Sequence, residues 1–347
     1  MEKYTSIRPG QPWLDTNGQR IQAHGGSVLY HNGRFYWYGE NKEKSQSEYD
    51  LWHWGIRMYS SVDLYNWEDE GIICLPVPED PDHPMHPKSQ VDRPHILYDE
   101  KQNRFVMWLK ILTLDPYFVV ALADTIHGPF QVSHVVKPHD FGCGDFDLVK
   151  DAVSGKAFIV FERVHSSMLV MELTEDYTNV TGPYTEHLVK SHPPFVREAP
   201  AIFRKDGKWW MFTSGTTAKF PNPTETAVAD DLHGPWKELG VTHVGDLKKT
   251  SFDSQISAVL QHPDHPSLYI ALADRWLVDL KPDLPNMMEV FDSWFDPNKE
   301  DLIPQKMRLL TAKNTSIADY VWLPVLFRED GTPYLEWMDE WRIEDFI

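Results

Sequence analysis

The chain has 347 residues and a formal net charge of −19, because 52 Asp and Glu residues face only 33 Lys and Arg residues. Such a charge repels nucleic acids and anionic membranes, so neither is an expected partner, and a polyanionic substrate is disfavoured. Hydrophobic residues make up 41% of the chain and aromatic residues 13%, enough for a sizeable core rather than a disordered chain. The composition therefore favours a neutral small molecule or a carbohydrate as partner.

The sequence lacks the common motifs of several other classes of enzyme and metal-binding protein. Cys74 and Cys143 form no CxxC pair, and the chain has no GxSxG, P-loop, GxGxxG or HExxH motif, so we expect no cofactor. His83 and His86 have a metal-like spacing, but they lie among prolines in a loop, and we expect no metal there. No apolar leader opens the sequence, which predicts a cytoplasmic protein; a secreted protein with its leader removed would look the same.

Short strands dominate the chain, and one hairpin pattern repeats along it. An apolar run, a polar turn and an aromatic-rich run follow one another in each copy. In chain order the copies are SVLYHNGRFYWYGE, HILYDEKQNRFVMWLK, DLVKDAVSGKAFIVFER, AIFRKDGKWWMFTSG and AVLQHPDHPSLYIALADRW. A sixth hairpin, WLPVLFREDGTPYLEWMDEW, closes the chain, and we expect it to form the outer half of the fifth repeat.

A polar residue stands just upstream of each apolar run. Successive members are 68, 53, 53 and 57 residues apart, and they are His24, Asp92, Asp145, Glu198 and Gln255. A period near 50 residues predicts an all-β, five-bladed β-propeller, with residues 1–347 as a single catalytic domain. Since the first strand of each blade lines the axis, we expect these five residues to surround one pocket.

Three carboxylic acids at the same phase of the repeat suit glycoside hydrolysis. The leaving oxygen needs a protonated acid, and a second carboxylate nearby raises the pKa of the first. The alternative for each acid is a structural pair with a nearby arginine, such as Arg93 or Arg197. Thr213, in the strand-ending TSG, is a candidate sugar contact or a plain turn residue. Sugar-stacking candidates, each with core packing as the alternative, are Trp52, Trp54, Trp210, Trp276 and Trp322.

Several segments together resemble glycoside hydrolase family 43, and within it most closely the exo-β-1,3-galactanase subfamily. They are IQAHGGSVLYHNGRFYWYGE, VDRPHILYDEKQNRFVMW, REAPAIFRKDGKWWMFTSG, TSFDSQISAVL and the closing YVWLPVLF…LEWMDEW. The similarity runs from about residue 20 to the end of the chain, in order and in spacing. The resemblance implies a five-bladed propeller and hydrolysis with inversion of configuration.

The resemblance also implies roles for individual residues. Glu198 matches the general acid, and Asp145 matches the acid that keeps it protonated and oriented. The aspartate that serves most of the family as general base is replaced here by AHGG, and Gln255 matches the glutamine thought to hold the attacking water. The residues implied to hold the sugar are Asp92, Glu40, His24 and Tyr117. The subfamily has a glutamate where this chain has Asp92, one methylene shorter.

The function expected from the sequence is therefore the exo-hydrolysis of terminal β-1,3-linked galactose from galactan or galacto-oligosaccharides. The alternatives are a related enzyme of other specificity, such as an α-L-arabinofuranosidase or β-xylosidase, and a non-catalytic sugar-binding propeller. Asp92, Glu40 and His24 all remain candidates for accepting the proton of the water. Residues 277–319 exceed the expected spacing between two motifs and predict an inserted loop over one face or at an oligomer contact.

Overall fold

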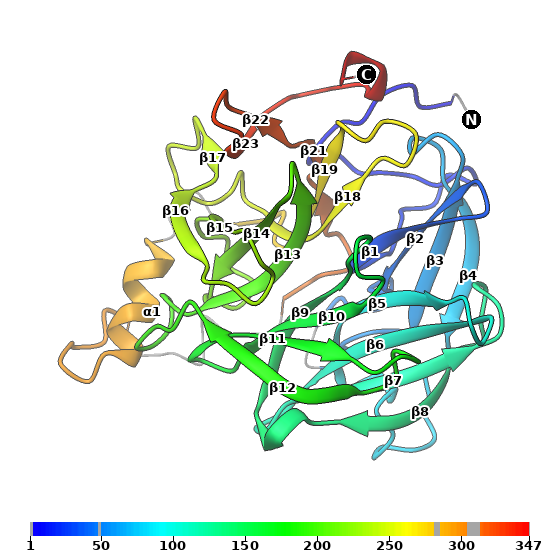
Figure 1. Cartoon of the computed structure of the whole chain (residues 1–347), viewed down its shortest axis with the longest axis horizontal. Helices are drawn as coiled ribbons and strands as arrows, with labels where there is room; N and C mark the ends of the chain where they lie inside the picture. The colour runs from blue at the N-terminus through cyan, green and yellow to red at the C-terminus, as the bar shows by residue number, and fades with distance from the viewer. Residues whose placement is uncertain (1–2, 48–49, 281–284, 304–312, 347) are drawn as a thin grey trace.

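The structure of the chain is a computed structural model that describes residues 3–47, 50–280, 285–303 and 313–346. In these residues 23 strands form six sheets arranged around an axis as a β-propeller (Figure 1). One α-helix, α1 (Met287–Phe295), lies at the periphery, and the described part of the chain also holds the short 3-10 helices η1 (Pro138–Asp140) and η2 (Ile343–Phe346). No helix among the described residues is long and apolar enough to cross a membrane.

Four sheets share one plan, in which four successive strands pair antiparallel. The first contains β1 (His24–His31), β2 (Arg34–Glu40), β3 (Ile56–Ser61) and β4 (Glu68–Cys74). The second contains β5 (Gln90–Asp99), β6 (Arg104–Leu112), β7 (Tyr117–Ala123) and β8 (Gln131–Val136). The third contains β9 (Cys143–Lys150), β10 (Ala157–Arg163), β11 (Ser167–Leu173) and β12 (Val180–His187). The fourth contains β13 (Arg197–Lys205), β14 (Lys208–Gly215), β15 (Glu225–Ala229) and β16 (Lys237–Val241).

The last two sheets are built from shorter strands. The fifth contains β18 (Gln255–Gln261), β19 (Tyr269–Arg275), β20 (Asp319–Tyr320) and β21 (Leu323–Pro324), of which the last two both pair with β19. The sixth contains β22 (Leu326–Phe327), β23 (Pro333–Glu336) and β17 (His243–Val244). The pairing of β17 with β23 is parallel, and it joins segments about 90 residues apart in the chain.

The prediction of five blades is therefore wrong, because the propeller has six sheets. The closing hairpin was expected to complete the fifth sheet, but only Leu323 and Pro324 pair with β19. The backbone N–H of Val325 still donates to the carbonyl of Tyr269, so the nitrogen of Pro324 points away from β19 and leaves the outer edge without an N–H for a further strand. The hairpin of β22 and β23 joins β17 instead. The sixth sheet is thus a peripheral blade that supplies no strand to the axis.

Local turn chemistry explains two of the inner hairpins. The β1–β2 turn has Asn32 and Gly33 at φ 49° and 81°, and the β13–β14 turn has Asp206 and Gly207 at φ 51° and 80°. Two consecutive left-handed residues are the mark of a type I′ turn, which matches the twist of paired strands. These turns fix the register of both hairpins, and with it the position of the residues at their open ends.

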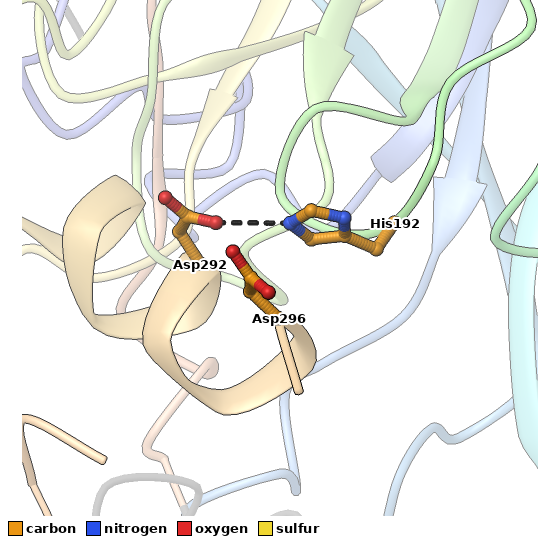
Figure 2. A group of neighbouring side chains, drawn as sticks. All are labelled: His192, Asp292 and Asp296. Atoms are coloured by element: carbon orange, nitrogen blue, oxygen red, sulfur yellow. Dashed lines mark hydrogen bonds and ion pairs between the residues drawn. The ribbon is translucent and has the colours of Figure 1, made fainter. Parts of the chain in front are cut away.

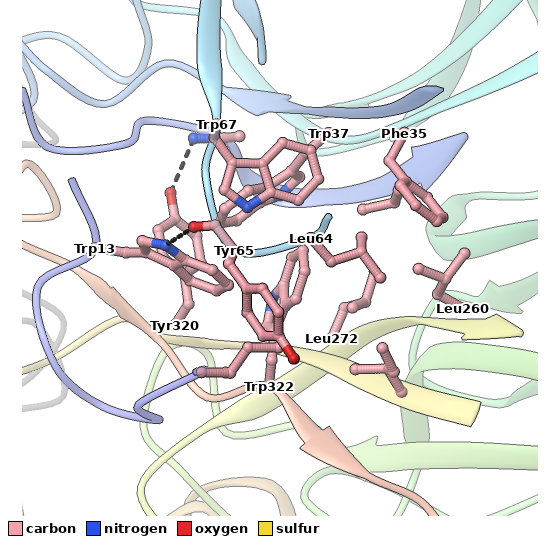
Figure 3. Packing of buried hydrophobic residues seen from close by; sticks show 14 of the residues in the cluster. Trp13, Phe35, Trp37, Leu64, Tyr65, Trp67, Leu260, Leu272, Tyr320 and Trp322 are labelled. Carbon is pink, nitrogen blue, oxygen red and sulfur yellow. Dashed lines mark hydrogen bonds between the residues drawn. The ribbon is translucent and has the colours of Figure 1, made fainter. Parts of the chain in front are cut away.

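An aromatic core fastens the ends of the chain to the first and fifth sheets (Figure 3). Trp37 lies at its centre, with its ring centroid 4.4 Å from that of Trp322 and 5.4 Å from that of Trp13. The backbones of Ile7 and Trp341 exchange two hydrogen bonds, so the two termini lie side by side. The core therefore closes the propeller by joining its first and last segments.

Candidate active site

The innermost strands of five sheets bring the repeated polar residues to one end of the axis. β1, β5, β9, β13 and β18 neighbour one another in a closed ring. The residues stand within the first three positions of these strands and are His24, Asp92, Asp145, Glu198 and Gln255. The geometric expectation that these positions gather around one region thus matches the arrangement of the backbone.

A β-bulge follows three of these residues. The strand register shifts after His24, Asp92 and Glu198. The next residue is left-handed in each case, namely Gly25 (φ 62°), Arg93 (φ 56°) and Ala199 (φ 50°). This conformation is costly for a residue other than glycine, and both bulges and such strain concentrate at functional sites, where they re-aim a side chain. The same β-bulge, with a left-handed residue after the polar one, thus recurs at the pocket end of three strands.

Gln255 and Glu198 contact each other directly. The amide nitrogen Nε2 of Gln255 lies 3.1 Å from Oε1 of Glu198 and donates a second bond to Oγ of Ser214 at 2.8 Å. The amide oxygen Oε1 accepts from the guanidinium of Arg93 at 2.5 Å. Since Arg93 can only donate, the orientation of the amide is determined by its partners. Both N–H bonds of the Gln255 amide are therefore engaged, and its oxygen keeps one lone pair for a water.

Asp145 is held as an anion by two buried cations. One carboxylate oxygen lies 2.5 Å from Nζ of Lys110, and the other lies 3.1 Å from Nη2 of Arg93. Although burial opposes ionisation, these charges keep the pKa of Asp145 well below its usual range. Asp145 therefore supplies a fixed negative charge in the site, with both of its oxygens occupied.

The pKa of Glu198 is shifted in the opposite direction. Burial, followed by the negative charges of Asp145 and Glu162, raises the pKa of Glu198 well above its usual value. The carboxyl of Glu198 therefore keeps its proton to higher pH than an ordinary glutamic acid, beside a carboxylate that stays ionised. Two acids driven apart in pKa by their surroundings are the arrangement expected of a general acid and the partner that maintains it.

Asp92 and Glu40 form a second group of acids beside this pair. Asp92 accepts from Nε1 of Trp52 at 3.0 Å and from Lys110 at 3.0 Å. Glu40 forms a 2.7 Å ion pair with Lys42 and accepts from the backbone N–H of Arg93 at 3.3 Å. Burial raises the pKa of Glu40 to about 7. Both residues lie on elements that meet at the Arg93 bulge.

Two tryptophans line the same region. Lys219 lies over both, with Nζ 4.0 Å from the ring centroid of Trp52 and 5.1 Å from that of Trp276. The ammonium of the buried Lys42 also lies near Trp52, with Nζ 4.5 Å from its ring centroid. The other sugar-stacking candidates are placed differently: Trp210 and Trp322 are buried in the core clusters. Trp54 lies under Lys44, whose Nζ is 3.4 Å from the ring centroid.

Three predicted sugar contacts have other protein partners in the structure. The ring of His24 is wholly buried, with Nδ1 3.0 Å from Asp274 and Nε2 3.3 Å from the Tyr320 hydroxyl. The hydroxyl of Thr213 is buried and accepts from Nε of Arg197 at 3.1 Å. Tyr117 begins β7, two strands outward from the axis, and packs against the core between the first two sheets.

The site contains four residues to which the sequence analysis gave no role in the pocket: Arg93, Lys110, Ser214 and Asp274. The strand register of the structure places three of them. Lys110 is the partner of Asp92, Ser214 is the partner of Glu198, and Asp274 is the partner of Gln255. Directly opposed residues of antiparallel strands project from the same face, but a plain count back from each hairpin turn falls one residue away from each of the three, because a bulge shifts the register in between. Ser214 alternates with Thr213, which explains why the hydroxyl at Ser214 faces Gln255.

The described part of the 277–319 segment supports one wall of the site; residues 281–284 and 304–312 lie outside the described residues. Helix α1 starts at the N-cap Asn286, whose side chain accepts from the backbone of Met288. Its apolar stripe packs with Phe220 and Trp276, and consists of Met287, Val290, Phe291 and Trp294. The helix therefore stabilises the segments that carry Trp276 and Lys219.

One group of metal-ligand side chains lies outside the pocket, where α1 meets the loop before β13. His192, Asp292 and Asp296 approach within 4.8 Å of one another, and Nε2 of His192 is 2.9 Å from Asp292 (Figure 2). The ammonium of Lys299 lies 2.5 Å from Asp292 and 3.9 Å from Asp296, so a lysine already supplies the positive charge there. These contacts fasten α1 to the loop that leads to Glu198.

A propeller with paired buried acids at one end of its axis defines a glycosidase-like site, and the sequence comparison agrees. The family model described as Glycosyl hydrolases family 43 matches residues 21–278. This match covers most of the chain, and the chain therefore belongs to family 43 of the glycoside hydrolases. A comparison with curated proteins finds no match.

Solved structures resemble the whole chain. A family 43 β-1,3-galactosidase superposes with a TM-score of 0.79 at 27% identity over 99% of this chain, and the chain spans 65% of its length. A second β-1,3-galactosidase, with galactodeoxynojirimycin, gives 0.78 at 27% identity, over 97% of this chain and 100% of that one. An exo-β-1,3-galactanase from Clostridium thermocellum gives 0.75 at 25% identity, over 97% of this chain and 66% of that one.

Proposed function

We propose that the chain is an inverting exo-glycosidase that releases terminal β-1,3-linked galactose from galactan or galacto-oligosaccharides. The observation that carries this proposal is the buried Glu198, whose pKa is raised, beside Asp145, which two cations hold as an anion. Glycosidic cleavage requires a carboxylic acid that is still protonated at neutral pH, because the leaving oxygen is a poor leaving group without a proton.

The state of Asp145 favours inversion over retention. A retaining enzyme uses its second carboxylate as a nucleophile that attacks the anomeric carbon. Both oxygens of Asp145 are bound to the cations Lys110 and Arg93, which lowers their reactivity toward carbon. Asp145 is thus suited to keep Glu198 protonated and oriented, while a water molecule held by the Gln255 amide attacks the opposite face of the sugar.

The choice of galactose is supported by the similar structures. Two of them are named as β-1,3-galactosidases and one as an exo-β-1,3-galactanase, and each aligns with at least 97% of this chain. In the proposed complex Asp92 and Glu40 accept hydrogen bonds from sugar hydroxyls. Trp52 and Trp276 offer apolar ring faces once the Lys219 side chain moves aside, since the cavity at Gln255 measures only about 10 Å³.

The variant Glu198→Gln tests the assignment of the acid. Gln keeps the shape and the hydrogen bond to Gln255 but has no proton to give to the leaving oxygen. We expect kcat on β-1,3-galactobiose to fall by about 100-fold or more, with galactose binding retained in calorimetry. A variant that hydrolyses the disaccharide at nearly the rate of the unchanged protein would contradict the proposal.

A panel of nitrophenyl glycosides and β-1,3-galactobiose tests the specificity. Galactose release, with the α-anomer appearing first in NMR spectra, is the expected result. Preferential release of arabinose or xylose would replace galactose as the substrate while leaving the mechanism in place. If no monosaccharide is released from any substrate although galactose binds, the proposed hydrolase activity is wrong and the chain is a sugar-binding propeller.

A further inference from the structure

We propose that Asp274 is the general base of this site, the group that takes the proton of the water as it attacks the sugar. The proposal rests on the hydrolase activity proposed above. It concerns the one step for which the sequence does not choose among its candidates Asp92, Glu40 and His24, because the first repeat lacks the aspartate that most family members are expected to have there.

Gln255 itself is poorly suited to accept the proton. Its amide oxygen already accepts from the guanidinium of Arg93 at 2.5 Å, and a cation at this distance lowers the basicity of the oxygen. The imidic acid tautomer, whose nitrogen could take a proton, has only one N–H, whereas Nε2 donates to both Glu198 and Ser214. The amide can orient a water, but the proton must go elsewhere.

Asp274 lies next to Gln255 on the neighbouring strand. The two residues are directly opposed in the pairing of β18 with β19, so their side chains leave the same face of the sheet. Both line one cavity of about 10 Å³, enough for a single water molecule. A carboxylate and an amide therefore face a space of the size that the attacking water needs.

The hydrogen bonds of Asp274 hold it in place and leave it able to accept more. Oδ1 lies 3.0 Å from Nδ1 of His24, and Oδ2 accepts from the backbone N–H of Gly25 at 3.0 Å. Burial lowers the pKa of His24, so its ring is neutral, with the proton on the nitrogen that faces the carboxylate. Each oxygen of Asp274 has one further lone pair for a water, and none of its partners is a fixed cation.

The position of Asp274 also separates it from the acid. Glu198 stands on β13, on one side of β18, whereas the carboxylate of Asp274 reaches β1 on the other side. An inverting enzyme needs its two groups apart, with the sugar and the water between them. The contacts with His24 and Gly25 place Asp274 beside the start of the first repeat, the place of the missing aspartate.

The proton balance is complete without another reactant. The water oxygen forms a bond to the anomeric carbon as one O–H bond breaks, and that proton goes to Asp274. The electron pair of the glycosidic C–O bond goes to the leaving oxygen, which takes the proton of Glu198. After the products leave, Asp274 returns its proton to solvent and Glu198 regains one, so both groups recover their initial states.

The test compares Asp274→Asn with Asp319→Asn on any glycoside that the unchanged protein hydrolyses. Asp319 is a matched control, since it is a buried aspartate on the adjacent strand β20 that pairs with Arg20 and is opposed to Arg275. We expect kcat of Asp274→Asn to fall about 100- to 10,000-fold with KM changed little, and that of Asp319→Asn to stay within about tenfold.

Rescue of turnover by azide distinguishes a general base from a merely structural residue, because azide is a nucleophile with no proton to lose. Adding sodium azide to Asp274→Asn should restore turnover and produce a glycosyl azide of inverted configuration, visible by NMR. If the asparagine variant does not fold, Asp274→Ser, whose smaller side chain leaves space for the anion, carries the same test.

Two results would overturn the proposal. One is a folded Asp274→Asn whose kcat stays within tenfold of the unchanged protein, or which gives no glycosyl azide. The other is azide rescue of Gln255→Ala but not of Asp274→Asn, which would return the base to Gln255. An unchanged protein that hydrolyses no glycoside at all would instead remove the proposed function, so the two failures are distinguishable.

Discussion

At the scale of single residues, the buried acids of the site lower the stability of the fold through unfavourable electrostatic interactions. Glu198 is buried beside Asp145 and Glu162, which makes its ionised form costly in the folded chain. In the unfolded chain the same carboxyl ionises near its ordinary pKa of about 4.3. The folded chain therefore holds the proton of Glu198 to higher pH than the unfolded chain, and the contribution of this group to stability decreases as the pH rises from the unfolded pKa toward the folded one.

The variant Glu198→Gln should accordingly be more stable than the unchanged protein at neutral and mildly alkaline pH. Glutamine fills the same space and never ionises, so the cost of protonating the carboxyl disappears. The difference in Tm between the two proteins should shrink toward about pH 4, where both unfolded chains are neutral at this position. Thermal unfolding followed by circular dichroism across this range checks the prediction; a constant difference at all pH values would contradict it.

A second prediction concerns the alkaline limit of activity. Because the charge of Asp145 raises the pKa of Glu198, Asp145→Asn should let Glu198 ionise at lower pH. The alkaline limb of the kcat/KM profile should then move to lower pH by about one unit or more, with a reduced maximum. Asp147→Asn is the control, since Asp147 lies two residues further along β9 and accepts from the backbone of Ile202. Equal shifts in both variants would argue against a specific role of Asp145.

At the scale of elements, the bulges at the pocket end of β1, β5 and β13 determine where the site residues point. In the first sheet the left-handed position is a glycine, Gly25, whereas the corresponding positions in the other two are Arg93 and Ala199. A glycine can be recognised in the sequence as a signal for such a bulge, but an alanine or arginine cannot. The repeat therefore predicts which residues begin the inner strands, but not that Arg93 turns into the site to bridge Asp145 and Gln255.

Register explains the remaining differences at this scale. Thr213 and Ser214 are equally plausible from the sequence, and only the pairing of Glu198 with Ser214 decides which hydroxyl meets Gln255. His24 stands at the expected position, yet its ring turns to Tyr320 and Asp274 because both lie against it on the fifth sheet. Contacts between sheets are set by tertiary packing, which a periodicity in one segment does not contain.

The strain at Ala199 gives a prediction with an internal control. Glycine removes the cost of the left-handed conformation, about 1 kcal/mol, while it also removes one buried methyl group. Ala199→Gly should therefore destabilise the fold by at least about 1 kcal/mol less than Ala201→Gly, where the strand is regular and the methyl is equally buried. Urea unfolding of both variants measures the difference, and equal losses would show that the bulge carries no strain.

At the scale of the whole molecule, the propeller depends on joining its ends. The sequence repeat predicts the five inner strands, since each begins after a similar turn and an apolar run. It does not predict that the closing hairpin leaves β19 after Val325 and pairs with β17, which creates the sixth sheet. Which distant segments pair is decided by the complete fold.

The contact between the first and last segments of the chain should contribute a large part of the free energy of unfolding. Trp341 is buried, exchanges backbone bonds with Ile7, and donates from its ring nitrogen to the backbone of Trp322 at 2.8 Å. Trp341→Ala leaves a cavity at the junction of the first and last segments, and we expect a loss of about 3–5 kcal/mol in the free energy of unfolding. Trp337, four residues earlier and 37% exposed, is the control, and its alanine variant should lose much less. Urea unfolding distinguishes the two, and similar losses would show that the contact between the termini does not hold the propeller closed.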